Sequence, residues 1–274
     1  MQKKKILSVI LFIVLALVSV VTVVPFVWMV CSSFKTNAEI SALDQHLLPQ
    51  QPTVENYTNL QGTFNFLSYF ANSIFIALVV TILVIYISTI SGFVLSKYRF
   101  RGRGLLFGCV LMTMMIPWAV TIIPRYTMFL QAGLQDNRIS LVLPVMVSGF
   151  GIFMLKQGID GLPNEILEAA RIDGANEFYL FHRIVFPMCK NNISAIAIFQ
   201  FLWCWEDYLW PYLMIDSSDK QLLAVGLTQF NGRFSTDYGG LFAATAISII
   251  PVLVIYLIFQ KRVVAGVAAS AVKG

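Results

Sequence analysis

Five residues near position 205 have side chains suited to binding a polyhydroxylated solute: Gln200, Trp203, Glu206, Asp207 and Trp210. Amide and carboxylate groups exchange hydrogen bonds with hydroxyls, and the flat apolar face of an indole stacks on a sugar ring. At helical spacing four of the five share one face, and Glu206 points away from that face. The stretch is therefore a candidate substrate path.

The same stretch has a second interpretation, which stays open. Trp and Tyr gather where a membrane meets water, and acidic residues are common at that boundary. An aromatic belt at the membrane surface would comprise Trp203, Trp205, Tyr208, Trp210 and Tyr212.

A polar segment, residues 165–187, lies between two long apolar runs. Ala169 and Ala170 leave one helix face flat enough for close approach, and they share that face with Ile166 and Asp173. Gly174 can adopt the left-handed conformation that ends a helix. The segment predicts a short exposed helix, a turn and a second helix, a shape that fits a groove on a partner protein.

Catalytic motifs are missing from the sequence. It has no G-x-x-x-x-G-K-[ST] loop to hold ATP phosphates. Its two histidines, His46 and His182, are far apart, and its four cysteines have no metal-site spacing. We expect no active site, no metal and no cofactor in this chain.

Composition indicates an integral membrane protein, since 58% of residues are hydrophobic and 12% are charged. A helix that spans a bilayer needs about 20 residues. Six uncharged, mostly apolar runs reach or approach that length. They are Ile6 to Val30, Tyr57 to Ser96, Gly104 to Pro124, Ile139 to Leu155, Asn191 to Trp205 and Tyr238 to Gln260. Six transmembrane helices in one domain, residues 1–274, are predicted.

Basic residues predict the orientation, because Lys and Arg are retained on the cytoplasmic side. With the N-terminus inside, fourteen of the 19 basic residues fall in inner segments. Both termini and the loop at about 158–190 are then cytoplasmic. The net charge of +5 reflects this topology and not binding to nucleic acid. The longest outer loop, Phe34 to Ser68, is expected to form short helices and to contact an external partner.

The fifth run is short, with 15 uncharged residues between Lys190 and Glu206. As a helix they reach about 22 Å, against a hydrocarbon core of about 30 Å. If the span starts at Pro187, Lys190 extends to the cytoplasmic headgroups, and Glu206 and Asp207 enter the outer part of the bilayer. Carboxylates at that depth normally face protein or water.

The spacing Glu168-Ala169-Ala170, Gly174, Ile184-x-x-Pro187 resembles the coupling loop of permease subunits in bacterial ATP-binding-cassette (ABC) importers. Phe186 stands where these permeases usually have Leu. The stretches Leu162-Pro163 and Ile172 to Ala175 resemble the carbohydrate-uptake branch, as does the tail 263–274. The Trp205-to-Pro211 run is similar to a Trp-Asn-Asp stretch of that family, with Glu206 in place of Asn.

The resemblance implies an all-α polytopic helix bundle with the type I importer fold, which is MetI-like and is also found in maltose transporters. Such a protein would lie in a bacterial plasma membrane and contact its lipids. It implies a sugar or polyol substrate, a second homologous permease, and an extracellular or periplasmic solute-binding protein. Two ABC ATPase subunits would bind ATP and Mg²⁺. The residues implied in coupling are Glu168, Ala169, Ala170, Asp173, Gly174, Ile184 and Pro187.

Other functions remain as alternatives. An independent secondary transporter or channel would typically show inverted repeats or several buried charges, and neither is evident. A membrane scaffold or sensor would be expected to carry a large soluble domain. Within the importer family, Arg125 near the outer end of the third run would suit a phosphorylated polyol such as glycerol phosphate.

Overall fold

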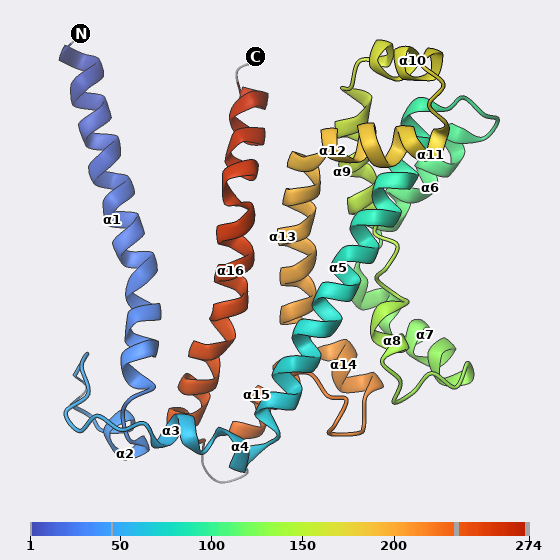
Figure 1. Ribbon diagram of the computed structural model, residues 1–274. Coiled ribbons are helices and arrows are strands. Elements are labelled where there is room, and N and C mark those ends of the chain that lie inside the picture. The colour runs from blue at the N-terminus through green and yellow to red at the C-terminus, as the bar shows by residue number, and fades with distance from the viewer. Residues whose placement is uncertain (1, 45, 233–235, 272–274) are drawn as a thin grey trace. The chain divides into compact units, whose positions relative to one another are not determined.

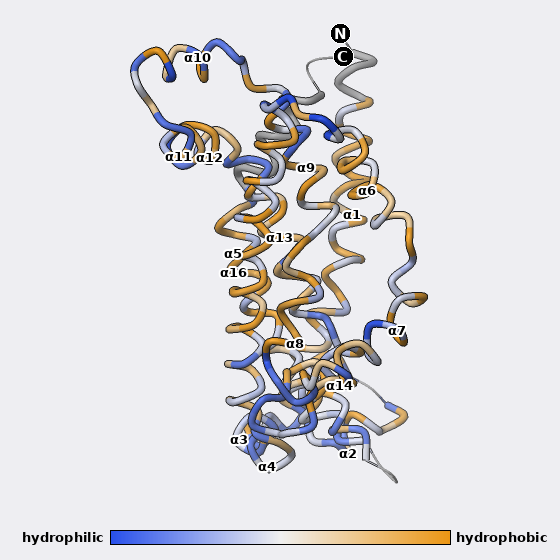
Figure 2. The backbone as a smooth tube through the Cα atoms, turned by 90° about the vertical axis from the view of Figure 1, so that its right-hand side faces the viewer, coloured by the Kyte–Doolittle hydropathy of each residue, from blue (hydrophilic) through white to orange (hydrophobic). Residues whose placement is uncertain are grey.

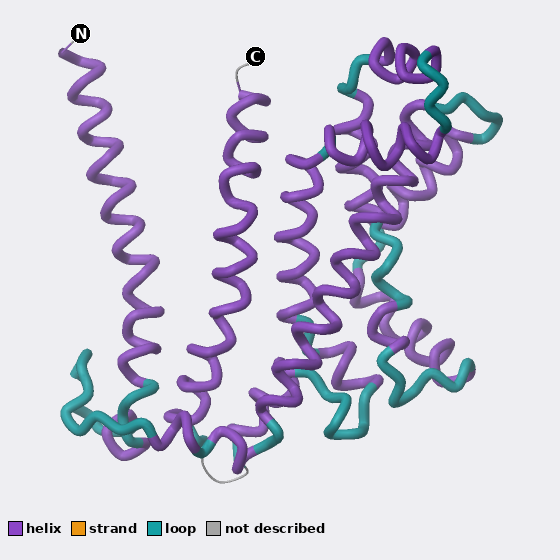
Figure 3. The backbone as a smooth tube through the Cα atoms, viewed as in Figure 1, coloured by secondary structure: helices purple, strands orange, loops and turns teal. Residues whose placement is uncertain are grey.

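The computed structural model describes residues 2–44, 46–232 and 236–271, which form helices joined by loops (Figure 3). In these ranges β-pairing is limited to one isolated bridge, between Asn231 and Thr236. The predicted all-α class is confirmed for the described residues. Contacts divide the chain into two compact units, residues 1–67 with 226–250 and residues 68–225 with 251–274.

The first unit contains α1 (Gln2–Ser32) and the first part of α16 (Tyr238–Ala271). Trp28 of α1 contacts Phe242 of α16 edge to face, with ring centroids 5.2 Å apart. The other elements are α2 (Asn37–Ile40), α3 (Glu55–Thr58), α4 (Leu60–Thr63), the end of α15 (Leu223–Leu227) and the 3₁₀ turn η2 (Thr228–Phe230). The loop after α1 thus forms the short helices expected of it.

The second unit carries most of the helices (Figure 1). In chain order they are α5 (Phe66–Lys97), α6 (Arg103–Met115), α7 (Trp118–Gln131), α8 (Ile139–Val142), α9 (Gly149–Asp160), α10 (Asn164–Ile172), α11 (Glu177–Tyr179), the π-helical segment η1 (Leu180–Val185), α12 (Phe186–Met188), α13 (Lys190–Glu206) and α14 (Leu209–Met214).

The core of the second unit includes buried residues of α5 and α9, together with others from α8, α10, η1, α13 and α14. Val80 and Val84 of α5 and Leu155 of α9 are fully buried in one apolar cluster. A Cβ atom at Gly92 would lie 2.8 Å from the backbone nitrogen of Lys156, so only glycine allows this approach. Apolar residues follow the long helices, and hydrophilic residues gather in loops such as those around α10 and α11 (Figure 2).

Three helices are long and apolar enough to cross a membrane: Leu7–Ser32, Phe66–Lys97 and Tyr238–Gln260. Two further candidates are bent pairs, Arg103–Met115 with Trp118–Gln131 at 102° and Glu177–Met188 with Lys190–Glu206 at 75°. The protein is therefore an all-helical membrane protein with three to five candidate spans, where the sequence predicted six.

Proline explains the sharper bend. Ile116 precedes Pro117 and is extended, with ψ of 115°, because a following proline disfavours the helical conformation.

The fourth apolar run, Ile139 to Leu155, differs from the prediction. It is not one helix: α8 ends at Val142, and α9 begins at Gly149, where the Ser148 hydroxyl accepts the Gly151 N–H at 3.1 Å. Pro144 in the connection has no N–H to continue α8. At the C-terminus α16 continues to Ala271, and Lys273 and Gly274 lie outside the described residues.

Candidate functional site

The predicted helix, turn and second helix at 165–187 are present in the second unit. The first helix, α10, follows Pro163, with Glu165 in its first turn and Arg171 in its last. A negative charge near the N-terminus and a positive charge near the C-terminus both interact favourably with the helix dipole. Leu167 is 2% exposed and joins α10 to the core.

The turn after α10 depends on Gly174, which has φ of +85°. Its N–H donates to the Arg171 carbonyl, and the Ala175 N–H donates to the Ala170 carbonyl, both at 3.0 Å. This pair of bonds around a left-handed residue is a Schellman motif. Ala170 and Ala175 also pack against the core, so the turn has a fixed position on the second unit.

The second helix is continuous from Glu177 to Met188 but widens into a π-helix at 180–185. There the Phe186 N–H donates to the Phe181 carbonyl, five residues back. Pro187 follows at once and has no N–H to donate, and π-turns accommodate such interruptions. The sequence did not predict this widening.

Helix α10 and the following turn border a pocket of about 450 Å³. Four of the seven predicted coupling residues line it: Ala170, Asp173, Gly174 and Ile184. The other three predicted coupling residues, Glu168, Ala169 and Pro187, are exposed. The apolar side chains of Ile172 and Phe178 are 87% and 71% exposed, a feature of protein interaction sites.

A polar contact that the sequence did not predict fixes the second helix. Arg171 Nε donates to Glu177 Oε1 at 2.9 Å, and the Tyr98 hydroxyl donates to Glu177 Oε2. Burial raises the pKa of the Tyr98 phenol to about 12, and the bond to Glu177 adds to the shift. The bond to Glu177 also raises the pKa of Arg171. Residues 98 and 177 are 79 positions apart, so no local pattern could have revealed the contact.

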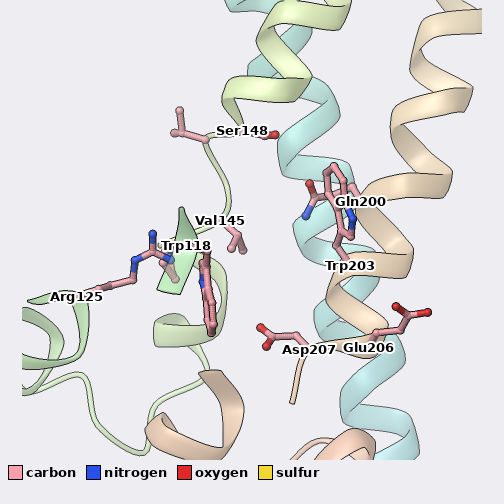
Figure 4. A pocket seen from close by; sticks show the side chains of 10 residues that line it. Trp118, Arg125, Val145, Ser148, Gln200, Trp203, Glu206 and Asp207 are labelled. Atoms are coloured by element: carbon pink, nitrogen blue, oxygen red, sulfur yellow. The ribbon is translucent and has the colours of Figure 1, made fainter. Parts of the chain in front are cut away.

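Four of the five predicted substrate-path residues border a second pocket, of about 560 Å³: Gln200, Trp203, Glu206 and Asp207. Figure 4 shows the Asp207 carboxylate directed toward the side where Trp118 and Arg125 lie, and the Glu206 carboxylate directed away from Arg125. Trp203 is 50% exposed. The pocket therefore combines hydrogen-bonding groups with an accessible indole.

One geometric prediction for this stretch is wrong, because the predicted helical face does not extend to Trp210. Helix α13 ends at Glu206, and Asp207 is extended with ψ of 114°, so the helical face does not continue to Trp210. Trp210 lies in α14, is 3% exposed, and donates from Nε1 to the Ser140 carbonyl at 2.8 Å. Glu206 borders the pocket, and its carboxylate is directed away from Arg125 (Figure 4). Trp118 was not singled out from the sequence.

Residues 85–269 match the family described as "Binding-protein-dependent transport system inner membrane component". The chain is similar to the arabinooligosaccharides transport system permease protein AraQ of Bacillus subtilis, at 31% identity over 94% of this chain and 93% of that protein. It is 33% identical to the diacetylchitobiose uptake system permease protein NgcG of Streptomyces coelicolor, over 93% and 85%.

Another relative is the sn-glycerol-3-phosphate transport system permease protein UgpE of Escherichia coli O6:K15:H31, at 33% identity over 85% of each protein. Among solved structures, a bacterial ABC transporter involved in the import of the acidic polysaccharide alginate matches with a TM-score of 0.84. That match covers 95% of this chain and 98% of the other at 22% identity, and it shows a shared fold.

The chain therefore belongs to the family of binding-protein-dependent transport system inner membrane components. It is a non-catalytic, multi-pass permease subunit of an ABC importer, as the sequence predicted. The ATPase subunits of such transporters are separate proteins, and membership implies ATPase and binding-protein partners.

Proposed function

We propose that this permease imports a carbohydrate and that Gln200, Trp203, Glu206 and Asp207 form part of the substrate path. The half-exposed Trp203 indole beside amide and carboxylate groups in one pocket carries this proposal. Such a surface can stack on a sugar ring while hydrogen-bonding its hydroxyls. The names of AraQ and NgcG, which refer to an oligosaccharide and a disaccharide derivative, support the same substrate class. Trp210 would act indirectly, because its ring lies against Arg125 of the pocket, with 5.8 Å between Arg125 Cζ and the ring centroid.

The alternative substrate is a phosphorylated polyol, as the name of UgpE indicates for that relative. Arg125 borders the pocket, but so do two carboxylates, Glu206 and Asp207. A phosphate dianion would meet a net negative charge there, which disfavours it. The charges thus favour a neutral sugar.

The loop at 158–190 is proposed to couple this permease to ATP hydrolysis. Glu168, Ala169, Ala170, Asp173, Gly174, Ile184 and Pro187 would form its contact with one of two ABC ATPase subunits, which bind ATP and Mg²⁺. The exposed apolar residues of α10 and the second helix support a protein contact there. A second permease and an extracellular or periplasmic solute-binding protein would complete the transporter.

The proposed topology has six spans in one permease domain, residues 1–274, with both termini cytoplasmic. The distribution of basic residues supports this orientation. The broken pair α8 and α9 would supply the fourth span. Irregular backbone at membrane depth is tolerated where protein or a water-filled path surrounds it.

Reconstitution tests the function. The complete transporter with its binding protein is placed in proteoliposomes, and ATP-dependent uptake of arabinotriose, diacetylchitobiose and glycerol 3-phosphate is measured. We expect uptake of a neutral sugar, reduced about tenfold or more in Trp203→Ala and partly retained in Trp203→Phe, which keeps an aromatic face. Trp28→Ala, in the first unit, is the matched control. Uptake of glycerol 3-phosphate alone would refute the substrate class, and ATP-independent uptake would refute coupling.

A further inference from the structure

The cytoplasmic end of α5 is attached to the coupling loop at three successive residues. Ser96 Oγ donates to Asp160 Oδ1 at 2.6 Å. Lys97 Nζ donates to the Leu162 carbonyl at 2.7 Å and to Asn164 Oδ1 at 2.8 Å. These bonds hold the end of α9 and the start of α10.

Tyr98 makes the third attachment. Its hydroxyl donates to Glu177, which also pairs with Arg171 at 2.9 Å. Arg171 and Glu177 stand on either side of the Gly174 turn, so this attachment includes both helices of the loop. We refer to the bonds of Ser96, Lys97 and Tyr98 as the inner latch.

The opposite end of α5 is attached to different loops. Asn72 Nδ2 donates to the carbonyls of Asp219 and Gln221 at 2.8 and 3.1 Å, and Asn72 Oδ1 accepts from Arg138 at 2.9 Å. Asn72 is 9% exposed, so both polar ends of its amide are used inside the structure. These contacts belong to the loop before α8 and the loop after α14.

Ser73 adds a fourth bond at this end, because its hydroxyl accepts the Leu223 N–H at 2.8 Å. The bonds of Asn72 and Ser73 form what we call the outer latch. All residues of both latches lie within the second unit.

Between the latches α5 is a single uninterrupted helix. Residues 73 to 96 span about 35 Å at 1.5 Å per residue, more than a hydrocarbon core of about 30 Å. No proline occurs in α5, whereas α1, α7 and α16 each contain one. Val80 and Val84 anchor its buried face. An unbroken helix without proline lacks the commonest cause of a sharp kink, so it can carry a displacement along its length.

We propose that α5 transmits movement of the coupling loop to the outer loops at 136–138 and 216–223 through its two latches. The inference rests on the coupling role proposed for the 158–190 loop. When an ATPase displaces α10, the inner latch moves the end of α5, and the outer latch carries that movement to the loops. Tyr98 and Asn72 are therefore positioning residues for transport.

The test reads the outer loops directly and needs no substrate. A nitroxide is attached to Ser218→Cys, an exposed position in the 216–223 loop, in the complete transporter with its native cysteines replaced. Electron paramagnetic resonance spectra are compared between the nucleotide-free state and the state trapped with ATP and vanadate. We expect a nucleotide-dependent change in the wild-type complex. In Tyr98→Phe this change should fall about three- to tenfold, because the variant loses one partly exposed hydrogen bond to a charged group. Tyr256→Phe, in α16, is the matched control.

The outer latch is tested in the same way with Asn72→Ala, or with Ser73→Ala if Asn72→Ala is not recovered as a folded complex. Combined with Tyr98→Phe, either variant should reduce the signal no further than the stronger single change, because both interrupt one element. The proposal would be overturned if the losses in the two single variants multiplied in the double variant. It would also be overturned if Tyr98→Phe alone kept the full nucleotide-dependent change. Co-purification of the ATPase is scored separately: its absence from the wild-type complex counts against the coupling role itself.

Discussion

Gly174 offers the sharpest test of the coupling loop. Its φ of +85° lies in the left-handed region, while a Cβ atom built on it meets nothing within 4 Å. Gly174→Ala therefore creates no clash in this chain, and the free energy that it costs comes from backbone strain alone. That cost is about 1–2 kcal/mol, which reduces the population of the turn by a factor of roughly 5–30.

A series of three variants separates backbone strain from bulk. Asn tolerates the left-handed conformation, so Gly174→Asn should retain most ATP-dependent uptake. Gly174→Ala should lose uptake roughly 5–30-fold if the ATPase recognises only the intact turn. Gly174→Trp adds a large side chain beside the 450 Å³ pocket and should abolish transport while the protein remains inserted in the membrane.

Uptake in proteoliposomes and co-purification of the ATPase are measured for each variant, and recovery of the inserted complex serves as the folding control. Equal losses in Gly174→Ala and Gly174→Trp would mean that only the turn matters and that nothing docks close to it. Wild-type uptake by Gly174→Trp would refute the coupling role assigned to this face.

Two further predictions concern charged contacts. Asp136 accepts from Lys220 Nζ at 2.6 Å and from Ser217 Oγ at 2.5 Å, and these bonds hold its pKa well below the usual range. The lowered pKa stabilises the fold above the unfolded pKa of about 3.9, and this contribution is lost as pH falls further. Thermal unfolding in detergent should therefore depend less on pH below about 4 in Asp136→Asn, and an unchanged profile would contradict the assignment. At the inner latch, Arg171→Glu should lower uptake per ATP hydrolysed, and adding Glu177→Arg should partly restore it. No recovery in the double variant would argue against a role for the ion pair.

The helix, turn and second helix at 165–187 could be predicted from sequence because their determinants are local. Two alanines, a glycine four positions after Ala170, and a proline beside the last residue of the second helix mark these elements without reference to the rest of the chain. The Schellman bonds connect residues no more than five apart, which is within the reach of such a pattern. The inner latch joins residues 64 to 79 apart, and no sequence pattern encodes those contacts.

The end of α13 shows a different limit. The predicted helical face assumed that the period of 3.6 residues continued through Asp207. Instead Asp207 leaves the helix, and its carboxylate accepts the Trp210 N–H at 3.4 Å, close to the start of α14. The N-cap of α14 is Tyr208, which makes no side-chain capping bond, and Pro211 is the third residue of the helix. Neither is the usual sequence signal of a helix start.

Two helices lead away from the coupling loop within the second unit, and they reach different targets. Helix α13 begins directly after the second helix of the loop, beyond a bend of 75°, and its last turns carry Gln200, Trp203 and Glu206 at the pocket. Helix α5 is not continuous with the loop in the chain; it holds the loop through the inner latch and through ring contacts such as Phe93 with Phe181, with centroids 5.9 Å apart, and it ends at the outer loops. Weakening the inner latch should therefore separate the two effects: nucleotide would still move the pocket through α13, while the movement of the outer loops would be reduced.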